Sequence, residues 1–127
     1  MTEVKYPEKD VPPIAYQSIL ERVGGDESFL EELLELYFED FPEKIEQLQM
    51  AVEQKNFELI RKLGHSLKGS SSTLSLTFLQ EASLQMEMAG GDKDIVKANK
   101  ALALLEQEFK RLKDFLSKKE HQVRQQK

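Results

Sequence analysis

The chain of 127 residues contains no cysteine and no tryptophan, and its only histidines are His65 and His121. Without cysteine, neither a disulfide nor thiolate chemistry is available. With so few histidines, one of them in the charged C-terminal stretch, the usual His-rich metal site cannot be assembled. We therefore expect this chain to bind no metal and no cofactor of its own.

The sequence also lacks long apolar runs and any stretch that resembles a signal peptide. This absence predicts a cytoplasmic protein that does not enter a membrane. A Gly-rich phosphate-binding loop is missing as well, so we expect no nucleotide site and no ATP-dependent kinase activity. The size of the chain fits one domain and leaves no room for a separate kinase domain.

The chain has fewer basic than acidic residues, so its formal net charge is −5 at pH 7. Nucleic-acid binding rests on a basic face that neutralises phosphates, so the deficit argues against it. Acidic residues crowd residues 26–46, and basic residues collect in residues 110–127. We interpret the acidic stretch mainly as a source of solubility, with steering of a partner as a second possibility.

Apolar residues recur at alternating spacings of three and four along most of the chain, and no strand pattern competes. This is the period of helices that each bury one face. The pattern and its flanking Gly, Pro, Asp and Asn residues predict five helices: a short one from Pro13 to Gly24 and Gly25, then helices from Asp26 to the connection at 54–56, from Phe57 to about Leu74, from Thr77 to Gly90 and Gly91, and from Asp92 to Ser117.

Several local features refine these boundaries. Asp26, Asn56 and Asp92 are expected to cap the helices that follow them. Pro42 lies inside the second helix and predicts a bend, because the apolar pattern continues beyond it. Thr77 together with Gln80 has the spacing of a capping box.

Long apolar stripes joined by short connections predict an all-α fold, an antiparallel four-helix bundle with an additional short N-terminal helix. The bundle domain is expected to span 13–117. A flexible lead-in precedes it at 1–12. A charged tail at 118–127 is expected to fray, which leaves His121 inert.

The stretch from Arg61 to Leu76 is unusual for a helix that serves only stability. On a helical wheel, Arg61, His65, Lys68 and Ser72 form one stripe opposite the apolar side. An exposed histidine alone is usually an ordinary surface residue, but here cations flank it. They would favour a neutral, nucleophilic imidazole and could offset negative charge added by phosphorylation.

Two glycines interrupt the same helix, each at a cost of about 1 kcal/mol relative to alanine. Gly69 lies beside His65 on the outer face, where the missing side chain would leave space over the imidazole for an approaching group. Gly64 lies toward the packed side. We expect it to permit close approach of a neighbouring helix.

The residues from His65 to Ser71, HSLKGSS, resemble the signature H-x-L-K-G-S-[SA] of the histidine-containing phosphotransfer (HPt) family. The acidic, apolar stretch of the second predicted helix up to residues 38–44 is also typical of that family. The chain departs from it at Ser75, where many members carry glycine, which concerns the local turn. The resemblance implies that His65 accepts a phosphoryl group and that Lys68 and Gly69 support it.

The same resemblance implies the partners. They would be receiver domains of response regulators or hybrid sensor kinases, and the Mg²⁺ of the reaction would belong to the receiver's acidic pocket. The chain would act as a shuttle in a multistep phosphorelay, as a monomer and without kinase activity of its own.

Other residues are open to two interpretations. Arg61 and Ser72 are placed either to reach a phosphoryl group or to be plain surface residues. An apolar docking patch for a receiver would come from whichever of Ile14, Ile19, Phe38 and Phe41 are exposed.

Two other functions compete with the relay. A docking adaptor would keep the bundle without the chemistry, although the intact His-x-x-Lys-Gly unit argues against it. A general acid-base enzyme lacks a second catalytic group, and a convex helix stripe provides no deep pocket. Acid-labile phosphate on the protein would separate the relay from both.

Overall fold

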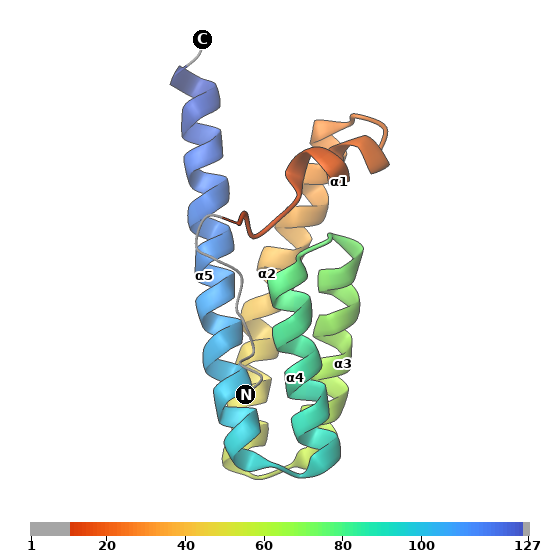
Figure 1. The fold of residues 1–127 in the computed structure, drawn as a ribbon, viewed down its shortest axis with the longest axis vertical. Helices are drawn as coiled ribbons and strands as arrows, with labels where there is room; N and C mark the ends of the chain where they lie inside the picture. Colours follow the sequence, from red (N-terminus) through yellow and green to blue (C-terminus); the bar gives the residue numbers. More distant parts are fainter. Residues whose placement is uncertain (1–10, 126–127) are drawn as a thin grey trace, which may run out of the picture.

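The computed structural model describes the backbone of residues 11–125 and the side chains of residues 11–118. Within that part of the chain there are five helices and no strand. Their bounds are α1 Tyr16–Arg22, α2 Glu27–Glu53, α3 Phe57–Thr73, α4 Thr77–Asp92 and α5 Ile95–Gln125. Figure 1 shows α2 to α5 side by side in alternating directions, with α1 across one end. The predicted all-α bundle is confirmed; most of the predicted lead-in at 1–12 lies outside the described residues.

Short loops with residues in the left-handed region join the first helices. Gly24 and Gly25 have φ values of +73° and +79°, which glycine adopts without a steric penalty, and they turn the chain from α1 into α2. The Asp26 side chain then accepts a hydrogen bond from the Phe29 amide at 3.0 Å. Asn56 does the same for the Leu59 amide at 3.2 Å, so both predicted caps are confirmed.

The prediction that α2 passes through Pro42 is confirmed, since the helix continues to Glu53. Proline removes one backbone donor, yet the helix is continuous there and buries Phe41 and Ile45 on either side of Pro42. The bend expected at this position stays a prediction.

Two predicted caps were wrong. Leu76 occupies the N-cap position of α4 and makes no side-chain capping bond, while Thr77 already lies within the helix. The buried Leu76 anchors this start, because its side chain belongs to the core. At α5 the cap is Asp94, whose carboxylate accepts from the Lys97 amide at 3.0 Å, and Asp92 is the last residue of α4.

The sequence had suggested that Gly90 and Gly91 end α4. The helix instead runs to Asp92, and the residue that caps its end, Lys93, has a φ of +54°. Gly90 instead meets α3, because a Cβ atom there would lie 2.4 Å from the Arg61 backbone nitrogen. Gly64 is equally tight, with a Cβ position 2.5 Å from the Glu87 nitrogen. Helices α3 and α4 thus each contribute one glycine to a close backbone contact with the other. This contact was predicted for Gly64.

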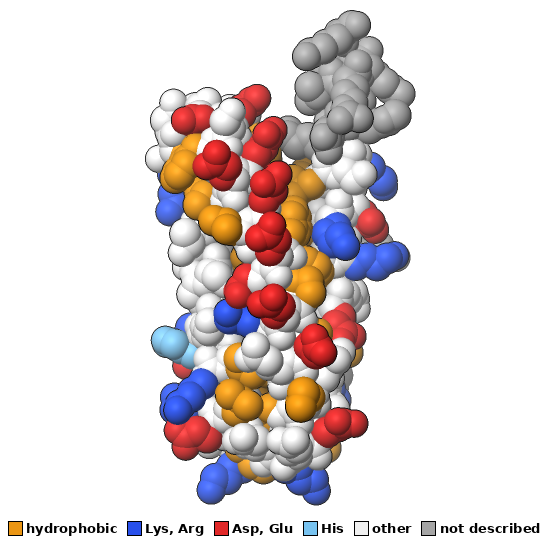
Figure 2. Space-filling model, turned by 180° about the vertical axis from the view of Figure 1, so that it is seen from behind, with side chains coloured by type: hydrophobic (Ala, Val, Ile, Leu, Met, Phe, Trp, Pro, Cys, Tyr) orange, Lys and Arg blue, Asp and Glu red, His pale blue; other side chains and the backbone are white. Residues whose placement is uncertain are grey.

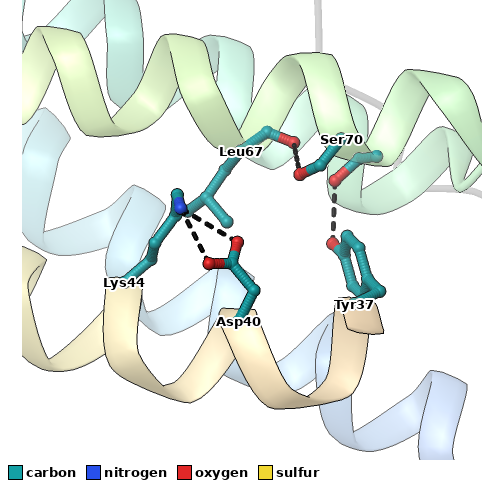
Figure 3. Close-up of polar contacts among 6 residues, drawn as sticks. Tyr37, Asp40, Lys44, Leu67 and Ser70 are labelled. Carbon is teal, nitrogen blue, oxygen red and sulfur yellow. Dashed lines mark hydrogen bonds and ion pairs between the residues drawn. The ribbon is translucent and has the colours of Figure 1, made fainter. Parts of the chain in front are cut away.

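The core lies between the four long helices. Phe41 of α2 stacks on Phe109 of α5 with ring centroids 4.0 Å apart. The Tyr37 hydroxyl of α2 bonds the buried Ser71 hydroxyl of α3 at 2.8 Å, and Figure 3 shows the tyrosine pointing across to that helix. Burial raises the pKa of Tyr37 well above its usual 10, so the phenol stays protonated and this link is maintained.

The predicted end of the last helix at Ser117 was wrong, because α5 continues to Gln125. Fraying of the charged tail stays a prediction. Residues 118–125 consist largely of Lys, Glu, Gln and Arg, which are good helix formers and include no Gly or Pro to stop the helix. The His121 side chain lies outside the described side chains. No helix in the described part of the chain is long and apolar enough to cross a membrane.

The two adjacent glycines of α4 give a matched test of the close contact. We expect Gly90→Ala to lower the free energy of unfolding by about 1 to 3 kcal/mol, because the new methyl group meets backbone atoms that cannot easily move. Gly91→Ala should instead be neutral or gain up to about 1 kcal/mol, since its Cβ position is open. Urea denaturation of both variants measures the difference; equal effects would contradict the assigned contact.

Candidate functional site

The outer face of α3 carries the stripe predicted from the sequence. The His65 side chain is 68% exposed, Arg61 and Ser72 are exposed, and Lys68 is half-buried. Ile60, Leu63 and Leu67 on the opposite side are buried in the core. The helix therefore presents the imidazole to solvent from a firmly packed support.

A residue of α4 that sequence reasoning missed, Glu87, joins this stripe. One carboxylate oxygen, Oε2, lies 3.1 Å from Nδ1 of His65. The other, Oε1, lies 2.7 Å from Nζ of Lys68. A single carboxylate thus bridges the imidazole and the ammonium group.

A sequence signal for Glu87 did exist, although it was weak. Gly64 predicted a close helix neighbour, and the apolar residues Met86 and Ala89 have the spacing of an inward face on the fourth predicted helix. A residue between those inward positions, on a helix pressed against Gly64, can reach the side chain next to the glycine. Which helix meets Gly64, and at which residue, depends on tertiary packing.

The charge on Glu87 fixes the hydrogen bond to His65. The pKa of Glu87 is lowered, first by the Lys68 bond and also by His65, against the opposing effect of burial. Glu87 is thus ionised at neutral pH and can only accept hydrogen bonds. The proton in the contact with His65 must then be on Nδ1, which leaves the lone pair of a neutral imidazole on Nε2.

Arg61 and Ser72 lie on the predicted stripe but not in this cluster. The Arg61 guanidinium pairs with Glu58 at 3.6 Å, one turn away from the histidine. Among the described residues, no side-chain hydrogen bond links Ser72 to His65. Neither position bonds His65 in the structure, and a role for either with a bound phosphoryl group stays a prediction.

The small residues after Lys68 divide into open and packed positions. No atom outside the local backbone lies within 4 Å of a Cβ position built on Gly69, so the surface beside it is open. The Ser70 hydroxyl donates to the Leu67 carbonyl at 3.2 Å, and Ser71 is buried against Tyr37. The open position at Gly69 matches the clearance predicted from the sequence.

The docking patch depended on which of four apolar residues are exposed. Ile14, Ile19 and Phe41 are each only 2% exposed, so they belong to the core and cannot form a docking surface. Ile14 and Ile19 are buried because α1 and the segment before it pack onto the bundle, and Phe41 stacks on Phe109. Phe38 is half-buried.

Other apolar side chains of α2 are exposed instead. Leu36 is 63% exposed and Phe29 is 46% exposed. Periodicity alone did not reveal them, because helix α2 has apolar residues on more than one side and only the packing decides which side is covered.

No group of three or more potential metal ligands occurs among the described residues. What the cluster offers is a nucleophilic nitrogen, a nearby cation and open space. These are the elements needed to accept a small anionic group from another molecule.

The ionised Glu87 should contribute to stability in a pH-dependent way. Its pKa in the folded chain lies below the ordinary 4.5, so the contribution is complete above about pH 4.5 and is lost as the pH falls through the lowered value. We expect the difference in unfolding free energy between wild type and Glu87→Gln to shrink below about pH 4.5. Urea titrations between about pH 3 and 7 measure it; a difference that stays constant over this range would contradict the assignment.

Comparison with known proteins agrees with this geometry. The Hpt domain family matches residues 32–115, which include α3, α4 and most of α2 and α5. The chain is also 34% identical over 76 residues to multistep phosphorelay regulator 1 of Schizosaccharomyces pombe, an alignment that covers 59% of this chain and 26% of that relative. No solved structure matched the chain. The family match covers well over half of the sequence, and the chain belongs to the Hpt domain family.

Proposed function

We propose that this chain relays a phosphoryl group between aspartyl-phosphorylated receiver domains through Nε2 of His65. The observation that carries the proposal is the hydrogen bond between Nδ1 and Glu87, which leaves Nε2 unprotonated on a side chain that is 68% exposed. Membership of the Hpt family and the similarity to a phosphorelay regulator support the same reaction. Action as a monomer in the cytoplasm is part of this proposal.

The reaction needs no proton to enter or leave the imidazole. The Nε2 lone pair attacks the phosphorus of the receiver's acyl phosphate, the P–O bond to the receiver's aspartate breaks, and its electron pair stays on that carboxylate. In the onward step a second receiver's carboxylate attacks phosphorus, and the P–N electron pair returns to Nε2. Glu87 holds the proton on Nδ1 throughout, so the leaving group is a neutral imidazole.

The neighbours of His65 support this reaction in different ways. Lys68 supplies positive charge at the carboxylate that also contacts His65, and Gly69 leaves space for the receiver to approach. Arg61 is exposed and one turn from the histidine, so it can leave Glu58 for a phosphoryl oxygen, and Ser72 can donate from the other end of the stripe. The Mg²⁺ of the reaction would be held by the receiver.

We further propose that the receiver docks on the α3-facing edge of α2. Asp40 and Lys44 point toward α3 in Figure 3, and Phe29 and Leu36 lie on that same side of α2 by helical periodicity. Figure 2 shows apolar side chains on both sides of an acidic stripe. Exposed apolar groups flanked by charged residues are typical of a protein interface.

The acceptor residue gives the decisive test. We expect His65→Gln to keep the fold, because the side chain is largely exposed, but to accept no phosphate. His121→Gln serves as the control and should accept phosphate at the wild-type rate. Each variant is mixed with a phosphorylated receiver, and acid-labile label is followed on both proteins. Label on His65→Gln at the wild-type level would exclude this residue, and an unlabelled wild type that still binds receivers would favour a docking adaptor.

Gly69 allows a separate test of access. Gly69→Leu should leave stability unchanged or slightly higher, by up to about 1 kcal/mol, because leucine is a better helix former and the position is open. Phosphoryl transfer should fall strongly, since the new side chain fills the approach to His65. Thermal melting and transfer rates measured on one preparation would show the two effects; an unchanged rate would mean that the receiver does not use this space.

A further inference from the structure

The Glu87 carboxylate engages two groups that the transfer reaction uses. Oε2 faces Nδ1 of His65 at 3.1 Å, and Oε1 faces Nζ of Lys68 at 2.7 Å. Oε1 is shielded from solvent, and the ion pair with the Lys68 ammonium is its close charged contact. In the unphosphorylated chain, therefore, the cation beside the acceptor nitrogen is already paired.

A phosphoryl group on His65 would compete with Glu87 for the same cation, the Lys68 ammonium. A phosphoryl group carries a charge of about −1.5 to −2 at neutral pH and has three strong acceptor oxygens. Nζ of Lys68 has three N–H donors, and any donor held by Oε1 is lost to the phosphoryl oxygens.

We propose that Glu87 limits how strongly His65 retains its phosphoryl group, by competing with that group for Lys68. The inference rests on the proposed function and concerns the balance of transfer rather than its chemistry. The contact of Glu87 with Nδ1 makes His65 a competent acceptor. The contact of Glu87 with Lys68 makes phosphohistidine less stable. A relay intermediate gains from this arrangement, since a phosphoryl group that is held too firmly does not move on.

Other cations on α2 and α3 are paired with carboxylates other than Glu87. Arg61 is bonded to Glu58, and Lys62 contacts the same glutamate at 3.7 Å. On α2, which packs against α3, Lys44 is paired with Asp40 at 2.9 Å. Lys68, by contrast, pairs with Glu87, the carboxylate that also contacts His65.

A double-mutant cycle separates competition from the other effects of Glu87. Wild type, Glu87→Gln, Lys68→Ala and the double variant are each equilibrated with one phosphorylated receiver, and the ratio of phosphohistidine to receiver phosphate is measured. Glutamine keeps an acceptor for Nδ1–H but removes the charge that holds Lys68. We expect Glu87→Gln to raise the ratio about fivefold, the size of a strong surface ion pair. In the Lys68→Ala background the same change should have little effect.

Glu81→Gln provides the matched control, because Glu81 is an exposed glutamate on the same helix and contributes no bond to the cluster. It should leave the ratio at the wild-type value. An equal rise with and without Lys68, or a fall caused by Glu87→Gln, would overturn the competition. A wild-type chain that takes no label at all would instead overturn the proposed function, so the two failures are distinguishable.

Discussion

The close backbone contact between α3 and α4 determines most of what this molecule can do. At Gly64 a Cβ atom would lie 2.5 Å from the backbone nitrogen of Glu87, and His65 is the next residue along α3. The contact that removes a side chain at Gly64 therefore sets Glu87 within hydrogen-bond reach of the imidazole. Gly90 repeats the contact one turn farther along α4, against Arg61, and fixes the pairing of the two helices.

A rigid support is needed because the site itself is exposed. The imidazole must be open to a second protein, so few neighbours can hold it in place. The structure holds it with one carboxylate from the adjacent helix and packs the opposite side of α3 through Ile60 and Leu67. The buried Tyr37–Ser71 hydrogen bond attaches the same helix to α2. Orientation thus comes from neighbouring helices, while access comes from the open face.

Much of the fold could be predicted from the sequence, because local rules determined it. The caps at Asp26 and Asn56 depend on residues three positions away, and the stripe that carries His65 follows from helical period alone. The failures concern longer-range effects. Gly90 looked like a helix end, since its role depends on Arg61 of another helix.

The candidate site shows the same division. His65 and the clearance at Gly69 follow from one helix, whereas Glu87 comes from a second helix whose register no local pattern gives. The prediction of exposed docking residues failed for a related reason. Both buried and exposed apolar residues of α2 follow a helical period, and only the positions of α1 and α5 decide that Phe41 is covered and Leu36 is not.

Ser75 shows how a departure from a family pattern can be compensated. It has a φ of +53°, the left-handed conformation that glycine adopts at little cost and serine does not. Its hydroxyl accepts a hydrogen bond of 2.8 Å from the Arg22 guanidinium at the end of α1. A glycine would relax the turn but could not make this bond. The Ser75 turn is therefore strained, but its hydrogen bond links it to Arg22. This bond couples the orientation of α1 to the loop that directly follows α3, the helix that carries His65.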